Sequence, residues 1–135
     1  DLLAGDSFFV TDNGVKSDGT FALLGEGVLR YTASSAVPAG TVLSYTGVGG
    51  DWTNESGSLN FPGAGDQAIV FNGTVDSPTF LCALQTVHDF WFSDATSPLA
   101  SALPPGLTAG SSNAIAAGCG RSCSPDGFDA WLDLE

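Results

Sequence analysis

The clearest structural signal in the chain is the segment Val28-Leu29-Arg30-Tyr31-Thr32-Ala33. Its residues Leu29, Tyr31 and Ala33 are apolar or aromatic and alternate with polar ones, and side chains two positions apart share one face of a β-strand. The pattern therefore predicts a strand with one buried face. Thr41–Thr46 repeats it after a Pro-Ala-Gly turn, so we expect the two strands to form an antiparallel pair.

Strand-like runs recur between turn residues along the whole chain. Ala68-Ile69-Val70-Phe71 is apolar throughout, which is typical of a central strand covered on both faces. Leu99–Gly110 is centred on Pro-Pro-Gly and is expected to cross the surface, because proline cannot donate to a β-ladder. The predicted strands are Ser7–Thr11, Val28–Ala33, Thr41–Thr46, Ser58–Phe61, Gln67–Asn72, Thr79–Leu84, His88–Phe92 and Asn113–Ala116. Their length and spacing predict an all-β fold, an antiparallel β-sandwich or jelly roll with little helix.

The composition agrees with this fold class. The chain has 135 residues, of which 43% are hydrophobic and only 13% are charged. This length suits one hydrophobic core, so residues 1–135 are expected to form a single β-sandwich domain. The best helix candidate is Gly127–Leu134, with Phe128, Trp131 and Leu132 on one helical face. A terminal strand fits slightly better, because acidic and apolar residues alternate there.

The chain is strongly acidic, which narrows the classes of partner. Three basic residues stand against fifteen Asp and Glu, giving a formal net charge of -12. Lys16, Arg30 and Arg121 are far apart in sequence, so we expect no nucleic-acid partner and no binding to anionic membranes. No apolar run approaches the roughly 20 residues that cross a bilayer, so membrane insertion is not expected. Asp1 is neither a methionine nor preceded by a leader, which predicts a processed or shortened chain.

Three cysteines allow at most one disulfide within the chain. We expect it to join Cys119 to Cys123, which lie in the flexible run Gly-Cys-Gly-Arg-Ser-Cys. Cys82 then keeps a free thiol. Its apolar neighbours favour a buried thiol, and pairing with a second chain is the alternative.

No recognisable catalytic set is present in the sequence. His88 is the only histidine, it lies in an apolar run, and no Gly-x-Ser-x-Gly motif surrounds a serine. Asp89, beside Phe90 and Trp91, could supply one of the two carboxyls of a glycosidase, but nothing nominates the second one. We therefore expect that the protein is not an enzyme.

Two acidic turns are candidates for a bound cation. Asp12-Asn13-Gly14 and Asp18-Gly19 carry the residues that β-turns favour, and a plain turn is the first interpretation. Ca²⁺ is the alternative, with Asp12 and Asp18 as ligands, because this ion binds carboxylate and carbonyl oxygens. No other cofactor is indicated.

Surface modification and sugar binding are both suggested by short motifs. Asn54-Glu55-Ser56 and Asn72-Gly73-Thr74 fit the acceptor pattern for N-glycosylation, and we expect Asn54 in a turn and Asn72 at a strand end, both accessible. Trp52 and Trp91 are candidate sugar-binding residues, because an indole stacks on the apolar face of a sugar. Packing in the core is the alternative for both.

Four further motifs follow one another in a fixed order. They are Phe9-Val10-Thr11-Asp12-Asn13-Gly14, Gly25-Glu26-Gly27 with the strand after it, Pro38-Ala39-Gly40-Thr41, and Gly65-Asp66-Gln67. In this order they resemble a β-rich domain of secreted bacterial and algal surface proteins, which is loosely similar to lamin-tail-like β-sandwiches. The similarity continues through 77–81 and 101–108. It implies an exported or surface-attached protein and supplies no catalytic residue.

The chain departs from that pattern at its beginning. The resemblance implies a further strand and turn before the Phe9–Gly14 element, whereas only Asp1–Asp6 precedes it here. We therefore expect a sheet that lacks one strand. Such a sheet exposes an edge that a segment of another chain can fill.

These observations favour an extracellular structural protein, a subunit of a filament, sheet or surface layer that assembles with itself through β-edge contacts. A module that binds carbohydrate or a surface partner through Trp52 or Trp91 is the alternative. Both predict an extracellular or cell-surface location, with a second copy or a glycan as partner.

Overall fold

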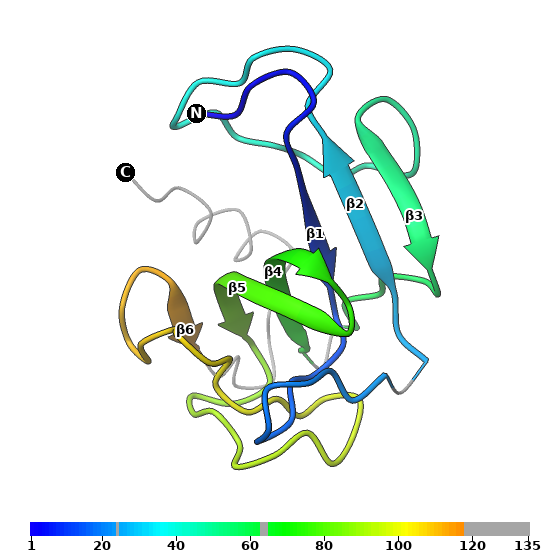
Figure 1. Cartoon of the computed structure of the whole chain (residues 1–135). Helices are drawn as coiled ribbons and strands as arrows, with labels where there is room; N and C mark the ends of the chain where they lie inside the picture. Colours follow the sequence, from blue (N-terminus) through cyan, green and yellow to red (C-terminus); the bar gives the residue numbers. More distant parts are fainter. Residues whose placement is uncertain (24, 63–64, 118–135) are drawn as a thin grey trace.

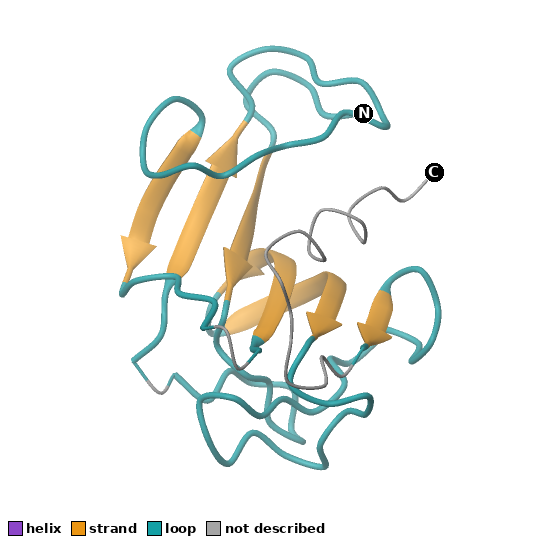
Figure 2. Ribbon diagram, turned by 180° about the vertical axis from the view of Figure 1, so that it is seen from behind, coloured by secondary structure: helices purple, strands orange, loops and turns teal. Residues whose placement is uncertain are grey.

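The computed structural model describes residues 1–23, 25–62 and 65–117. This part of the chain contains strands and no helix, so the all-β class is confirmed (Figure 2). The strands are β1 (Ser7–Thr11), β2 (Val28–Thr32), β3 (Trp52–Ser56), β4 (Gln67–Thr74), β5 (Ser77–Gln85) and β6 (Ala114–Ala116). The predictions for Cys119, Cys123 and Gly127–Leu134 lie outside the described residues.

All six strands belong to one sheet, in the order β3-β2-β1-β4-β5-β6. Neighbours are antiparallel, except that β6 runs parallel to β5. The described residues contain no second sheet, so the sandwich or jelly roll is not confirmed. Long loops gather at the two ends of the sheet instead: residues 33–51 at one end, and residues 12–27 and 86–110 at the other (Figure 1).

Most of the strand predictions are confirmed. Ser7–Thr11 matches β1, and the predictions at 28–33, 67–72, 79–84 and 113–116 match β2, β4, β5 and β6 to within a few residues. The run in β4 is central, as its continuous apolar character predicts. Ile69 and Phe71 are fully buried, and Ala68 and Val70 on the other face are half-buried.

The predicted partner of β2 is wrong. Thr41–Thr46 is irregular and mostly exposed, and β3, which the sequence did not predict, pairs with β2 instead. Since β1 occupies the other side of β2, only one further strand fits beside it. The alternation at Leu43 and Tyr45 reflects ring packing: the Tyr45 ring lies 5.4 Å from that of Trp52. Ser58–Phe61 and His88–Phe92 are not strands either.

The hydrophobic core lies on one face of the sheet, under the loop that follows β1. The Phe71 ring of β4 packs against Phe9 at 5.2 Å and against Phe21 at 4.9 Å between centroids. Val15 and Phe21 come from the loop, and both are buried against the sheet. This loop covers the core face of the sheet, which in a β-sandwich would be covered by a second sheet.

The segment 99–110 is only partly a surface crossover. It forms no strand, as its prolines predict, but Ser101 and Ala102 are buried. The Ala102 amide donates to the carbonyl of Val15 at 2.8 Å, and Phe92 pairs with Ala102 in a single β-bridge. The first half of the segment therefore belongs to the core, because its backbone closes the layer under β4.

The short N-terminal segment does not leave β1 at an edge. β1 pairs with β2 on one side and with β4 on the other, and Leu2 pairs with Val37. The two edges of the sheet are β3 and β6.

Candidate functional site

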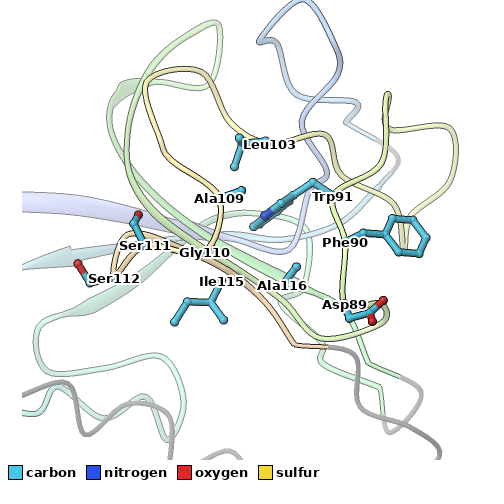
Figure 3. A pocket seen from close by; sticks show the side chains of 10 residues that line it. All are labelled: Asp89, Phe90, Trp91, Leu103, Ala109, Gly110, Ser111, Ser112, Ile115 and Ala116. Carbon is cyan, nitrogen blue, oxygen red and sulfur yellow. The ribbon is translucent and has the colours of Figure 1, made fainter.

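A groove of about 660 Å³ lies between the segment that carries Trp91 and the loop that leads into β6 (Figure 3). We call it the Trp91 groove. The side chains and backbone that line it belong to Asp89, Phe90, Trp91, Leu103, Ala109, Gly110, Ser111, Ser112, Ile115 and Ala116. In Figure 3 the Trp91 indole points across the groove toward Ala109 and Gly110, whereas the Phe90 ring points away.

Trp91 carries an unused hydrogen-bond donor. Its side chain is half-buried against the core, and its Nε1 atom is buried without a hydrogen-bond partner. A buried indole N–H normally finds an acceptor. The groove therefore offers an aromatic surface together with one unsatisfied donor.

Polar groups flank the groove on an ordered loop. The Ser111 hydroxyl donates to the carbonyl of Thr108 at 2.6 Å and is also in close contact with Asn113 Oδ1. The Gly110 amide donates to the carbonyl of Ala114 at 2.8 Å, which fixes the loop against β6. Ser112 and Asp89 remain exposed. This arrangement can bind a small polar ligand with an apolar face.

His88 lies next to the groove in a cluster of rings. Its imidazole stacks on Phe90 at 4.9 Å and meets the edge of Phe92 at 5.0 Å. Within the described residues, no hydrogen bond joins His88 to a serine, a cysteine or a carboxylate. Asp89 likewise has no second carboxyl in the groove lining.

A second polar cluster lies buried at the end of the sheet where β1 ends and β4 begins. We call it the polar junction; its members are Asp12, Asn13, Glu26, Asp66 and Gln67. The Asp12 carboxylate accepts hydrogen bonds from the amides of Gly27 at 2.7 Å and Asn60 at 2.8 Å. It thereby connects the loop before β2 with the loop after β3.

Burial dominates the electrostatics of the polar junction. Burial, followed by the charges of Asp66 and Asp12, raises the pKa of Glu26 to about 8. Burial also raises the pKa of Asp66 to about 7, against a hydrogen bond from the Gln67 amide that lowers it. The ion pair that the described chain contains, Arg30 Nε to Glu55 Oε1 at 3.0 Å, involves neither residue. Among the described residues, no cationic side chain forms an ion pair with the junction.

Asp12 and Asp18, the two predicted calcium ligands, have no partner in common. Asp12 is buried in the polar junction, whereas Asp18 is exposed and accepts from the amide of Thr20 at 2.9 Å and from its hydroxyl at 2.7 Å. Asp18 therefore stabilises a turn, as the first interpretation of this motif predicts. In the described ranges, no three His, Cys, Asp or Glu side chains converge as a metal centre.

Glu26, Asp66 and Gln67 were missed as site residues. Glu26 lies between two glycines in Gly25-Glu26-Gly27, and Asp66 and Gln67 follow a glycine in Gly65-Asp66-Gln67. Both motifs served only for the family resemblance. A charged or amide residue directly before a buried strand was the available signal. Such a residue becomes buried when loops close over the end of the sheet.

Trp52 is a structural residue rather than an open platform. Its ring makes edge contacts with Phe8, Tyr31 and Tyr45, and its Nε1 donates to the carbonyl of Ser44 at 3.1 Å. We call these four rings the aromatic corner. Tyr45 is the ring most open to solvent, at 41% exposure.

Both glycosylation sequons are exposed. Asn54 lies in β3 rather than in the predicted turn, and its Nδ2 donates to the carbonyl of Gly57 at 3.0 Å. Asn72 lies near the tip of the β4–β5 hairpin. Accessibility agrees with the prediction for each, and glycosylation itself stays a prediction.

The prediction of a buried thiol at Cys82 is confirmed only in part: the residue is exposed, although burial raises the pKa of its thiol. Cys82 is exposed on β5, opposite Val70 of β4. A bulge in the β4–β5 ladder between Val70 and Phe71 changes the register beside it. An apolar neighbourhood in sequence therefore did not predict burial of the whole residue here.

Comparison of the chain with protein-family models, with curated proteins and with solved structures found no match. No helix long and apolar enough to span a membrane occurs in the described residues.

Proposed function

We propose that the domain is a binding module of an extracellular protein, and that the Trp91 groove takes a sugar ring. The observation that carries this proposal is the Trp91 indole, which points across the groove (Figure 3) and whose buried Nε1 donor has no hydrogen-bond partner. A sugar presents an apolar face that stacks on an indole and hydroxyls that accept from its N–H. A volume of about 660 Å³ is in the range of small-molecule pockets.

The surrounding charge favours a neutral ligand. Asp89 lies at the rim of the groove and the whole chain has a formal net charge of -12. A phosphorylated or carboxylated ligand would be repelled, because no Lys or Arg lines the groove. Neutral hydroxyls, by contrast, can donate to the Asp89 carboxylate and to the hydroxyl of Ser112.

The proposal is tested by removing the donor and keeping a ring. Trp91→Phe removes the indole N–H, and Trp52→Phe is the matched control, because that N–H already bonds to Ser44. A glycan array on the full chain identifies the probe, and isothermal titration calorimetry then compares the variants. One hydrogen bond is worth about 0.5–1.5 kcal/mol, so we expect Trp91→Phe to weaken binding roughly 3- to 10-fold.

Two results would overturn the sugar site. One is an array with no glycan bound above background. The other is a bound glycan whose affinity is the same for Trp91→Phe and the wild type while Trp52→Phe weakens it.

A second candidate function is structural self-assembly through the β3 edge, with a second copy of the chain as partner. β3 pairs only with β2, and four of its five residues are exposed. The Thr32 amide donates to the carbonyl of Asp51, so these two residues form a hydrogen-bonded pair of the antiparallel ladder. Bonded pairs alternate along such a ladder, so Arg30 and Thr53 form the next one. The main-chain groups of Asn54, which follows Thr53, therefore point away from β2. Asn54 thus offers an open ladder position.

Two features make this edge short. Gly49 and Trp52 exchange main-chain hydrogen bonds at 3.0 and 3.1 Å, which uses the outward groups of Trp52. A register shift between Val28 and Leu29 interrupts the ladder at the other end. Bulges and covered ends are how sheets protect their edges from pairing. The groove is therefore our first candidate and the edge our second.

A proline substitution at Asn54 tests the edge. Asn54→Pro removes the outward N–H without touching the bonds to β2, and Asn54→Ala is the control that keeps it. If copies pair here, light scattering after gel filtration should show concentration-dependent oligomers for the wild type and Asn54→Ala, and monomers for Asn54→Pro. A wild type that stays monomeric at all concentrations contradicts this candidate.

A further inference from the structure

A second, smaller pocket opens directly onto the polar junction. It has a volume of about 250 Å³ and is lined by Asn13, Leu23, Gly25, Glu26, Ser56 and Gly57. Asn13 follows the end of β1, Glu26 comes from the loop before β2, and Ser56 from the end of β3. Three segments that are distant in sequence therefore converge on one cavity, and each brings a polar side chain to it.

The unsatisfied atoms of the polar junction are all hydrogen-bond acceptors. Asn13 Oδ1, Glu26 Oε2 and Gln67 Oε1 are buried without a hydrogen-bond partner. The amide nitrogen of Asn13 is satisfied, since it donates to Thr11 Oγ1 at 2.8 Å. The nitrogen of Gln67 is satisfied as well, by the carbonyls of Asp12 and Pro98. Gln85 lies opposite Gln67 in the β4–β5 ladder and has a buried Nε2 donor without a partner. The pocket is lined by Asn13 and Glu26 but not by Gln67, so the unpartnered oxygens on its side are Asn13 Oδ1 and Glu26 Oε2.

The orientation of Asn13 is fixed by these bonds. Its side chain is only 2% exposed, and its nitrogen is held by Thr11, which in turn donates to the carbonyl of Gly27 at 2.6 Å. Exchanging the oxygen and nitrogen of Asn13 would lose the bond to Thr11 and leave a buried donor without a partner. The Oδ1 atom is therefore the unpartnered end of a side chain that lines the pocket.

Two further carboxyl groups lie close enough to interact with Glu26, which lines the cavity. Asp12 is 2% exposed and Asp66 is 3% exposed, and both interact electrostatically with Glu26. Buried carboxylates are normally paired with a cation or a metal, because an isolated buried charge is costly. Within the described residues, no Lys or Arg pairs with any of the three.

We propose that the polar junction binds a divalent cation, with Ca²⁺ as the best fit, and that Glu26 and Asn13 supply side-chain oxygens to it. Asp12 contributes charge, since both of its oxygens already accept main-chain amides. Ca²⁺ takes carboxylate, amide, main-chain and water oxygens in flexible geometry, which suits a cavity with few carboxylates. Mg²⁺ demands a near-ideal octahedron and fits such a mixed set less well.

Binding would fasten the loops that close this end of the sheet. Glu26 precedes β2, and Ser56 and Gly57 follow β3, so a cation in the pocket would hold the two loops together beside the existing Asp12 bonds. This site is independent of the Trp91 groove, because the two pockets share no lining residue.

The experiment titrates CaCl₂ into the full chain after treatment with EDTA, in buffer with salt to screen the surface charge. Calorimetry measures binding and thermal unfolding measures its effect on the folded state. A ligand at a hundredfold excess over its Kd should raise Tm by roughly 5 °C or more in a domain of this size. MgCl₂ at the same concentration should raise it less.

Two Glu→Gln variants form the matched comparison. Glu26→Gln removes a proposed ligand, and Glu55→Gln makes the same change on the exposed strand β3. We expect Glu26→Gln to lose at least tenfold in Ca²⁺ affinity and Glu55→Gln to behave like the wild type. In EDTA, Glu26→Gln should be at least as stable as the wild type, because Gln matches the neutral form of the side chain that the raised pKa of Glu26 favours. If Glu26→Gln does not fold, Glu26→Asp is the substitute. It keeps the carboxyl group on a side chain that is shorter by one methylene, so its oxygens lie farther from the cation and binding should also weaken severalfold.

The proposal fails if the wild type shows no Ca²⁺ binding up to about 10 mM, above the weakest affinities of extracellular calcium modules. It also fails if Glu26→Gln and Glu55→Gln are stabilised by Ca²⁺ as much as the wild type, because the effect is then general screening of an acidic chain.

Discussion

The two ends of the sheet are closed by opposite means. At one end the aromatic corner holds the loop 33–51 through ring contacts, with Trp52 at 5.1 Å from Tyr31 and 5.4 Å from Tyr45 between centroids. At the other end the polar junction holds its loops through hydrogen bonds and direct backbone contact (Figure 1). Rings can shift and still bury area, whereas backbones in contact cannot move apart without losing specific bonds. The first end should therefore tolerate substitution better than the second.

Close backbone contacts at the polar junction lie at Gly27 and Gly57. A Cβ atom at Gly27 would lie 2.1 Å from the amide nitrogen of Leu59, and one at Gly57 would lie 2.2 Å from the carbonyl oxygen of Glu26. The Gly27 amide also donates to Asp12, and its carbonyl accepts from Thr11. Any side chain at Gly27 must displace the loop after β3 and break these bonds.

The largest effect should follow from Gly27→Ala. We expect a loss of about 3 kcal/mol or more in the free energy of unfolding, from overpacking combined with broken buried hydrogen bonds. Urea denaturation measures it. Gly40→Ala is the control: its φ of 82° favours glycine, but no atom lies within 4 Å of its added Cβ. It should cost only about 1 kcal/mol. Equal losses for the two variants would contradict the view that steric contact dominates.

An intermediate effect should follow from Trp52→Ala in the aromatic corner. The ring is half-buried, so we expect a loss of about 2–3 kcal/mol, below the range for a fully buried tryptophan. The loss should be local: hydrogen exchange and proteolysis should increase in the loop 33–51, and the amides of β4 should remain protected. Trp52→Phe should recover most of the stability. Global unfolding by Trp52→Ala would show that the corner is part of the main core.

The smallest effect concerns the pKa of Asp51 and, through it, stability at low pH. Hydrogen bonds from Ser34, and then the one from the Tyr31 hydroxyl, hold the pKa of Asp51 below its usual value, against an opposing contribution from burial. A lowered pKa stabilises the fold above the pKa of the unfolded state, and this contribution is lost as pH falls through the folded value. Carbon-detected NMR titration should give Asp51 a lower pKa than an ordinary aspartate, and Tyr31→Phe should raise that pKa. An unchanged Asp51 pKa in Tyr31→Phe would show that the hydrogen bond from the Tyr31 hydroxyl does not stabilise the Asp51 carboxylate.

Local sequence patterns predict those strands whose own residues show which face is buried. β1 and β4 carry their alternation or their apolar run in their own residues and were predicted within a few positions. β3 was missed because Trp52-Thr53-Asn54-Glu55-Ser56 is polar and exposed apart from the tryptophan. Its place beside β2 depends on which segment reaches that edge, and this is a property of the whole chain.

The candidate sites divide in the same way. Trp91 was identified because a tryptophan, whose indole can stack on a sugar, is visible in the sequence itself. Glu26 and Asp66 were not, because their burial depends on loops that close over the end of the sheet from elsewhere in the chain. The pairing of Asp12 with Asp18 followed sequence proximity, and the structure places Asp12 in the buried polar junction and Asp18 in an exposed turn.

The Gly49–Trp52 bridge, described above as a cover for the edge of β3, also gives Asn54 a double significance. Because Trp52 has no free outward groups, the adjacent free main-chain position belongs to the same asparagine that carries a glycosylation sequon. A glycan attached there would stand over the open backbone and occupy the space that an incoming strand needs. Modified and unmodified copies of one chain would then differ in whether they can pair, with no change in sequence or fold.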